Sequence, residues 1–126
     1  MKKQISDVKN FHDSFGIENK EIPSLNNKSF MLRFNLMKEE NEEYLNACKE
    51  GNIIEIADAL GDMMYILCGT ILSHGLQYKI EEIFTEIQSS NMSKLGEDGK
   101  PIYREDGKVL KGPNYFKPNI KTILHS

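Results

Sequence analysis

Apolar residues recur at helical spacing along most of the chain. Side chains at positions i, i+3, i+4 and i+7 share one face of a helix, and this pattern predicts four helices over about residues 6–15, 28–49, 52–74 and 78–92. Gly16, Gly51 and Gly75 lie at the ends of the first three segments, where glycine readily adopts the left-handed conformation that ends a helix. Asn52 is a favourable N-cap for the third. We therefore predict an all-α fold, an antiparallel bundle of about four helices.

The third segment lacks a polar face, and a helix that is apolar all round is expected to be buried. Its apolar residues are Ile53, Ile54, Ile56, Ala57, Leu60, Met63, Met64, Ile66, Leu67, Cys68, Ile71 and Leu72. The second segment carries a narrower apolar face, formed by Phe30, Phe34, Met37, Tyr44 and Ala47. Cys48 and Cys68 both lie in apolar helical sequence. We expect two buried free thiols, as is typical of a cytoplasmic protein.

Residues 93–126 follow a different pattern. They contain three of the four prolines, and the sequence Glu-Asp-Gly-Lys occurs twice, at 97–100 and 105–108. Each Asp-Gly predicts a turn, with short strands at 102–103 and 109–110. We interpret the chain as a single domain, 1–126, with a helical body (1–92) and an irregular C-terminal extension (93–126).

The net charge of −3 hides an uneven distribution. Fifteen acidic and nine basic residues precede Ser93, whereas four acidic and seven basic residues follow from there. The mild overall acidity argues against nucleic acid as a partner. The longest uncharged stretch, 63–78, is too short and too interrupted by polar residues and glycine to span a membrane. No signal or transit segment is visible at the N-terminus.

Three carboxylates interrupt the apolar third segment. Glu55, Asp58 and Asp62 are three and four residues apart and therefore project from one stripe of the helix. Ionised groups on a buried helix lose their hydration and repel one another. Each unpaired buried ion costs on the order of several kcal/mol of folding free energy. A cationic group should therefore compensate them.

The second segment supplies more acid instead of basic partners. Glu39, Glu40 and Glu43 converge on one face, whereas Glu42 points elsewhere. The short connection at Gly51 folds the two segments back on each other, which can set the acidic stripes opposite one another. Facing carboxylates are the ligand set of a hard divalent cation, Mg²⁺ or Mn²⁺.

Plainer interpretations exist for part of this set. A run of glutamates on a helix is often a solvated face, and Glu55 with Asn52 resembles a capping box. Asp58 and Asp62 have neither explanation, because they lie inside the helix among apolar residues. A di-iron bundle is excluded, since no histidine follows a glutamate at the required spacing. His12 is interpreted as a helix-face residue and His74 as lying near a helix end.

Glu39-Glu40-x-x-Glu43 followed by Glu55-x-x-Asp58 resembles the EExxE…ExxD signature of the all-α NTP pyrophosphohydrolases. That superfamily includes MazG-like enzymes, phosphoribosyl-ATP pyrophosphohydrolase and the all-α dUTP diphosphatases. The resemblance continues through residues 58–65, which are similar to the family's D-x-x-x-D core helix, and covers about residues 1–92. Segments 90–94 and 111–115 resemble the C-terminal extension of a MazG-like subset.

The resemblance implies hydrolysis between the α- and β-phosphates of a nucleoside triphosphate, with Mg²⁺ (or Mn²⁺) as cofactor, in a homodimer or homotetramer. Glu40, Glu43, Glu55 and Asp58 match the metal ligands, and Glu39 matches the carboxylate that binds a further metal or orients the attacking water. Asp62 goes beyond the minimal signature and is included as an additional or outer ligand. Metals about 3.5–4 Å apart can activate water and clamp the leaving pyrophosphate.

The basic extension could bind phosphate. Asn91 and Lys94 are the first candidates, with Arg104, Lys108 and Lys111 behind them, although these side chains could equally serve only to keep a turn-rich tail soluble. Phe11, Phe15 or Tyr115 could stack on the base, although aromatic residues at helical spacing more often belong to the core.

We expect a cytoplasmic, MazG-like pyrophosphohydrolase that removes non-standard or deoxynucleotides from the nucleotide pool. The alternatives are phosphoribosyl-ATP hydrolysis in histidine synthesis, and a helical oligomer that binds nucleotide or divalent metal without turnover.

Overall fold

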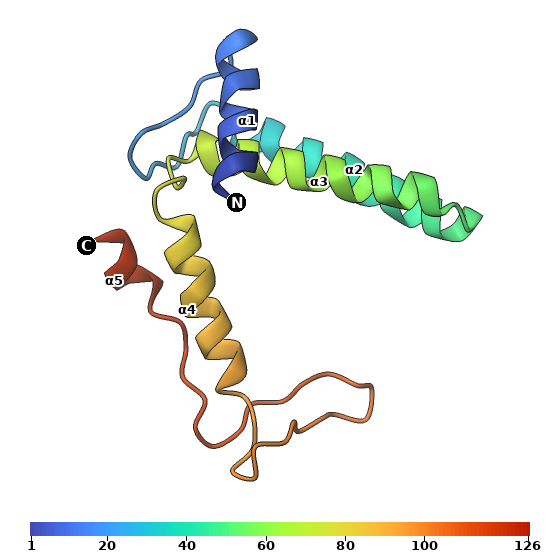
Figure 1. Cartoon of the computed structure of the whole chain (residues 1–126), viewed down its shortest axis with the longest axis vertical. Helices are drawn as coiled ribbons and strands as arrows, with labels where there is room; N and C mark the ends of the chain where they lie inside the picture. Colours follow the sequence, from blue (N-terminus) through green and yellow to red (C-terminus); the bar gives the residue numbers. More distant parts are fainter. The chain divides into compact units, whose positions relative to one another are not determined.

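A computed structural model describes residues 1–126, and its regular structure is entirely α-helical. The helices are α1 (Lys2–Ser14), α2 (Phe30–Glu50), α3 (Ile53–Ser73), α4 (Ile80–Met92) and α5 (Ile120–Leu124) (Figure 1). The predicted all-α class is therefore confirmed. Two details differ: α1 begins at Lys2, before the predicted start, and α5 was not predicted.

The chain divides into two compact units, Met1–Tyr78 and Lys79–Ser126. The division precedes α4, whereas the change in composition follows it. Within the second unit, α4 is bound to the extension. The Ser90 hydroxyl donates to the Phe116 carbonyl at 2.8 Å, and Lys79 Nζ donates to the Ser126 carbonyl at 3.0 Å.

Helices α2 and α3 form a hairpin and lie side by side along their length (Figure 1). Gly51 ends α2 in the left-handed conformation, with φ 67°, and its N–H donates to the Cys48 carbonyl at 3.1 Å. Asn52 then caps α3, since its side-chain oxygen accepts the Glu55 N–H at 3.2 Å. Both helix-end predictions are confirmed.

At the other end of the hairpin, α1 packs on α3 and the connection 15–29 binds the last turn of α3. The Lys20 N–H donates to the Leu72 carbonyl at 3.0 Å, and Asn26 Nδ2 donates to the Ser73 carbonyl at 2.8 Å. Gly75 has φ 68°, and a Cβ at this position would lie 2.1 Å from the Ile22 carbonyl oxygen. Only glycine fits this close approach of two backbones.

The buried residues of α3 gather at this covered end: Cys68, Gly69, Ile71, Leu72 and Ser73, with Ala59 alone nearer the Gly51 end. Ile53 and Ile54 are 73% and 76% exposed. The prediction that this helix is buried all round is therefore wrong for the single chain, because α1 and α2 cover only part of its surface.

The predicted apolar face of α2 is also largely uncovered. Phe30, Phe34, Met37 and Tyr44 are exposed, and Ala47 is buried. Cys68 is buried as predicted, but Cys48 is exposed, so the prediction of two buried thiols is wrong for Cys48. Its position near the end of α2 has no helix packed over it.

By length and composition, α3 is also apolar enough to cross a membrane, with a mean hydropathy of 1.3. A single helix of this kind is weak evidence, because core helices of soluble proteins have the same properties. Its carboxylates and its pairing with α2 point to packing against protein.

In the second unit, the two Asp-Gly turns form as predicted. Gly99 and Gly107 have φ 75° and 89°, and the aspartate of each turn, Asp98 or Asp106, accepts the N–H two residues later at 3.0 and 3.1 Å. The predicted strands at 102–103 and 109–110 do not form, because only an isolated antiparallel bridge joins Tyr103 and Val109.

Candidate metal centre and adjoining hollow

Three carboxylates meet across the α2–α3 hairpin. Glu40 and Glu43 lie one turn apart on α2, and Asp62 lies on α3. One oxygen from each lies within 4.8 Å of the others. No lysine or arginine forms an ion pair with any of the three. We call this group the carboxylate triad.

One atom of the triad distinguishes it from a solvated acidic face. Glu40 Oε2 is buried and has no hydrogen-bond partner. Leaving a buried acceptor unsatisfied costs about 1–3 kcal/mol, and more for a charged group. Such an oxygen is suited to a cation, and carboxylate oxygens are the preferred ligands of Mg²⁺. The residues present therefore fit a divalent metal.

The electrostatics of the triad point the same way. Burial, the adjoining carboxyl group of Glu43, and the charges of Asp62 and Asp58 raise the pKa of Glu40 to about 7. Without a cation, the protein relieves the repulsion by keeping a proton on Glu40 near neutral pH. A bound cation would displace that proton.

The remaining predicted ligands line an open cleft next to the triad. Glu55 and Asp58 line this cleft of about 360 Å³ together with Glu43, which also belongs to the triad. The structure thus places five of the six predicted carboxylates along one side of the hairpin. Glu39 is exposed and lines neither region, so its role toward the attacking water stays a prediction. Asp62, predicted as an additional ligand, lies in the tightest group.

Glu40 and Asp62 also line a second hollow, of about 300 Å³, toward the covered end of the hairpin. We call it the aromatic hollow, because Phe11 of α1 and Tyr65 of α3 lie on its wall with their rings edge to face at 5.6 Å between centroids. The other lining residues are His12, Ile17, Arg33, Leu36 and Ile66. Phe15 stacks near Phe11 but does not line the hollow.

Arg33 is a buried cation in this hollow that sequence reasoning missed. It is 7% exposed. Its Nε donates to Thr70 Oγ1 at 3.2 Å, and its Nη2 donates to the Ile66 carbonyl at 3.0 Å. No carboxylate pairs with it, and burial lowers the pKa of its guanidinium from the usual value. A signal was present, because Arg33 precedes Glu40 by seven residues and so shares its face of α2.

Gly69 makes room for this arrangement. A Cβ at position 69 would lie 2.4 Å from Arg33 Nη2 and 2.9 Å from His12 Nε2. Gly69 follows Asp62 by seven residues, so it lies on the same face of α3 two turns later. The missing side chain lets two polar groups from α1 and α2 approach α3.

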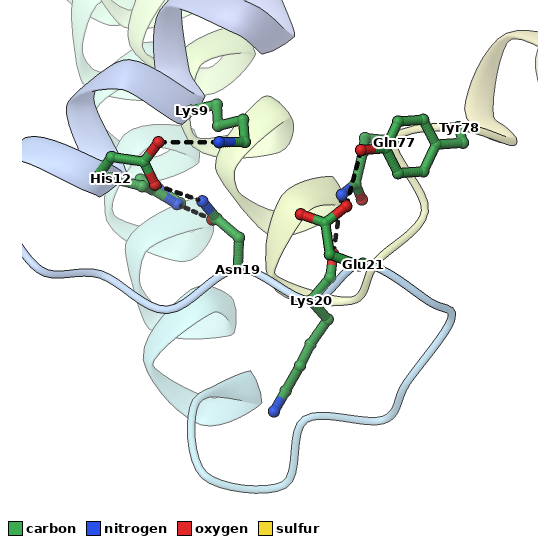
Figure 2. Close-up of polar contacts among 8 residues, drawn as sticks. Lys9, His12, Asn19, Lys20, Glu21, Gln77 and Tyr78 are labelled. Atoms are coloured by element: carbon green, nitrogen blue, oxygen red, sulfur yellow. Dashed lines mark hydrogen bonds and ion pairs between the residues drawn. The ribbon is translucent and has the colours of Figure 1, made fainter.

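His12 lies on the buried face of α1, with Ile5 and Val8. Its Nδ1 lies 2.6 Å from Asn19 Oδ1, and Asn19 Nδ2 donates to Asp13 at 3.5 Å (Figure 2). Lys9 in turn pairs with Asp13 at 2.9 Å (Figure 2). An amide oxygen only accepts, so His12 Nδ1 carries a hydrogen and, in the neutral ring, Nε2 is an acceptor.

His74 lies at the C-cap of α3, as predicted, and its Nδ1 contacts the Ser24 carbonyl at 2.8 Å. It is therefore part of the covered end and not of the site.

The predicted phosphate-binding residues lie in the second unit. Arg104 is paired with Asp106, and Lys111 Nζ lies 4.7 Å from the centroid of the Tyr115 ring. Asn91 lies in the last turn of α4, and its carbonyl accepts the Lys94 N–H at 3.2 Å. Their role toward phosphate stays a prediction.

Comparison with known families gives one result. The family model described as phosphoribosyl-ATP pyrophosphohydrolase matches residues 8–91. That span begins in α1, ends in α4 and contains all six predicted carboxylates. A search of curated protein sequences found no match.

Proposed function

The chain belongs to the phosphoribosyl-ATP pyrophosphohydrolase family, within the MazG-like all-α NTP pyrophosphohydrolase superfamily, and from this premise we propose a Mg²⁺-dependent nucleoside triphosphate pyrophosphohydrolase. The family hydrolyses a pyrophosphate bond. The observation that carries the metal assignment is the buried Glu40 oxygen without a partner, inside a triad that no basic residue neutralises.

The carboxylate triad, with Glu55 and Asp58 beside it, would hold the metal. When bound, Mg²⁺ or Mn²⁺ neutralises phosphate oxygens and lowers the pKa of a coordinated water. The protein's own residues would hold a triphosphate with its α-phosphorus in line with an attacking water. The water oxygen bonds to the α-phosphorus, the bond to the bridging oxygen breaks, and a monophosphate and pyrophosphate leave. Glu39 is our candidate to accept the water's proton.

The two recesses suggest how the substrate lies. The triphosphate fits the acidic cleft only with a metal between the like charges, and the base fits the aromatic hollow, since aromatic rings stack on bases. Asn91, Lys94, Arg104, Lys111 and Tyr115 of the second unit are proposed to contact the polyphosphate or the base. The biological role we propose is clearance of non-standard or deoxynucleotides.

A second candidate substrate is phosphoribosyl-ATP. The description of the matching family favours it, and the same carboxylates would serve the same bond cleavage. A helical protein that binds nucleotide and Mg²⁺ without turnover is the non-enzymatic alternative.

The exposed apolar faces of α2 and α3 support a homo-oligomer, either a dimer or a tetramer. Phe34, Leu60 and Met64 are 56%, 49% and 41% exposed, which is unusual for so many large side chains on a small monomer. We propose that further copies of the chain cover these faces, and that neither membrane nor nucleic acid is a partner. Light scattering should give a mass of at least twice 14.5 kDa. A monomeric mass would contradict this.

Pyrophosphate release tests the proposed activity. Wild-type protein with Mg²⁺ is assayed against standard, deoxy and oxidised nucleoside triphosphates and against phosphoribosyl-ATP. Glu43→Gln and Asp58→Asn should each lower the rate by about a hundredfold or more, because each removes a metal ligand. Glu42→Gln is the matched control on the same helix, outside both the triad and the cleft, and should keep full activity.

The outcomes separate the candidates. Activity retained in both ligand variants, with helical content unchanged by circular dichroism, would overturn the site assignment. Turnover of phosphoribosyl-ATP alone would support the second substrate. Nucleotide binding that requires Mg²⁺ but gives no monophosphate from any substrate would support the non-enzymatic alternative.

A further inference from the structure

The two Asp-Gly turns of the extension form a matched pair that differs in one side chain. Each lies in the sequence x-Glu-Asp-Gly-Lys, where residue x is Gly96 in the first turn and Arg104 in the second. We propose that Asp98, in the first turn, is a site of spontaneous covalent modification to isoaspartate, and that Arg104 protects Asp106 from the same reaction. This inference does not depend on the proposed function.

The reaction needs no partner other than water. The Gly99 nitrogen bonds to the side-chain carboxyl carbon of Asp98, and the proton of that nitrogen leaves with the carboxyl hydroxyl as water, which gives a five-membered imide. Water then adds to one imide carbonyl carbon, and the bond from that carbon to the nitrogen breaks. Cleavage at the main-chain carbon leaves the chain linked through the Asp98 side chain, which is isoaspartate. Only the protonated carboxyl group carries the hydroxyl that leaves.

The first turn brings the reacting groups together. Asp98 Oδ1 accepts the Lys100 N–H at 3.0 Å, so the side chain folds back over the following backbone. The Gly99 nitrogen lies within the ring that this hydrogen bond closes. Gly99 has no side chain to obstruct the attack, and a Cβ at this position would have no atom within 4 Å. Residues 97–100 are exposed, so water can reach the imide.

The second turn has nearly the same backbone. In each turn the glycine N–H donates to the carbonyl of residue x at 2.9 Å, and the N–H of residue x donates to the lysine carbonyl at 2.8 Å. The two aspartates accept the N–H two residues later at 3.0 and 3.1 Å. The attacking nitrogen is therefore held alike in both turns, and a difference in reactivity must come from the carboxyl group.

The carboxyl groups have different partners. Arg104 Nε donates to Asp106 Oδ1 at 2.9 Å, and Arg104 Nη2 pairs with Oδ2. This guanidinium fork holds both oxygens and lowers the pKa of Asp106 from its usual value, so the reactive acid form is rarer. Asp98 forms no ion pair, because Gly96 has no side chain to supply one. The side chains of Arg104 and Asp106 are 53% and 57% exposed, so the protection is partial.

The experiment is prolonged incubation of the full chain at neutral pH, with isoaspartate located by mass spectrometry with electron-transfer fragmentation. In wild type, isoaspartate should form about threefold faster at Asp98 than at Asp106, the size of effect expected for an exposed ion pair. Arg104→Gly makes the second turn match the first, and it should raise the rate at Asp106 about threefold and leave the rate at Asp98 unchanged. Lys117→Gln, the matched control, removes an equal charge from the extension and should change neither rate.

A second measurement separates the fold from the local sequence, since Pro101 follows the first turn where Val109 follows the second. In concentrated urea the turn that aligns Arg104 with Asp106 is lost, and the two wild-type rates should become equal. A difference that persists in urea would overturn the role of Arg104, as would an unchanged rate at Asp106 in Arg104→Gly. Equal rates in the folded wild type, or faster modification at Asp106, would overturn the whole proposal.

Discussion

At the Gly75 end of the α2–α3 hairpin, α1 and the connection 15–29 cover the helices, whereas the Gly51 end stays open to solvent. The covered end contains nearly all the buried residues of α3. At the open end, Ile53 and Ile54 are largely exposed. Glu40 and Asp62 lie between the two, and both line the hollow that reaches Arg33 and His12.

Polar groups are treated differently at the two ends. At the covered end most of them are paired: Asn26 Nδ2 donates to the carbonyl and the hydroxyl of Ser73 at 2.8 and 2.9 Å, and Ser29 lies 3.0 Å from the same hydroxyl, although Gln77 Oε1 is buried there without a partner. At the open end, the carboxylates have no basic partner. A hairpin built this way obtains stability from one end and keeps unbalanced charge at the other for a ligand. The following predictions test that division, from the largest expected effect to the smallest.

Two glycines allow the ends to be compared by one substitution. Gly75 and Gly51 have nearly the same φ, 68° and 67°, but a Cβ meets the Ile22 backbone only at Gly75. Gly75→Ala should lower the free energy of unfolding by about 3 kcal/mol, from backbone strain plus the steric clash. Gly51→Ala should cost about 1 kcal/mol, from strain alone. Urea unfolding measures both, and equal losses would contradict the difference between the ends.

The pH dependence of metal binding tests whether Glu40, beside the aromatic hollow, carries a proton in the metal-free protein. The pKa of Glu40 is raised to about 7 in the metal-free protein, so a cation must displace a proton below that pH. The apparent Kd for Mg²⁺ should therefore fall about tenfold between pH 6 and pH 8. Calorimetry at both values measures it. Glu40→Gln should bind more weakly and without this pH dependence, whereas Glu42→Gln should behave like wild type.

Glu40 also makes the stability of the metal-free protein depend on pH, in the opposite direction to that of an ordinary ion-paired carboxylate. Because folding raises the pKa of Glu40 from 4.5 to about 7, the contribution of Glu40 to the free energy of unfolding is fully present below pH 4.5 and is lost as the pH rises through 7. The Tm of metal-free wild type should fall between pH 6 and pH 8 relative to that of Glu40→Gln. A Tm difference that stays constant over this range would show that Glu40 is ionised throughout.

The smallest effect concerns the cap at the open end. Asn52→Ala removes the acceptor for the Glu55 N–H and should cost about 1 kcal/mol in urea unfolding. Asn52→Ser keeps a capping oxygen and should restore most of that loss. If the alanine variant is as stable as wild type, the first turn of α3 contributes nothing to folding.

Local chemistry explains what could be predicted from the sequence. Helical periodicity with Gly51 and Asn52 gave the hairpin, since capping depends only on neighbouring residues. The carboxylate group followed from spacing on two antiparallel helices. The extension's turns followed from Asp-Gly. Predicting these features does not require knowing which residues far apart in the sequence are in contact.

The errors concern long-range packing. The burial of Arg33 and His12 was not predicted, because it depends on Gly69, on another helix, which leaves the space that these side chains occupy. Cys48 and the apolar side chains of α3 were assigned to a core that one chain cannot supply, since burial depends on how many neighbours a helix has. The N-terminal turn of α1 carries lysines, and its helicity comes from packing of Ile5 and Val8 on the rest of the unit.

The unequal exposure of the two cysteines gives the protein a built-in reporter. Cys48 is accessible and Cys68 is buried, so a maleimide dye should attach once per chain, three residues before the turn at the open end. The chain has no tryptophan, which leaves the ultraviolet fluorescence of an attached donor free of that background. The one accessible native thiol can thus report ligand binding and subunit exchange without any engineered residue.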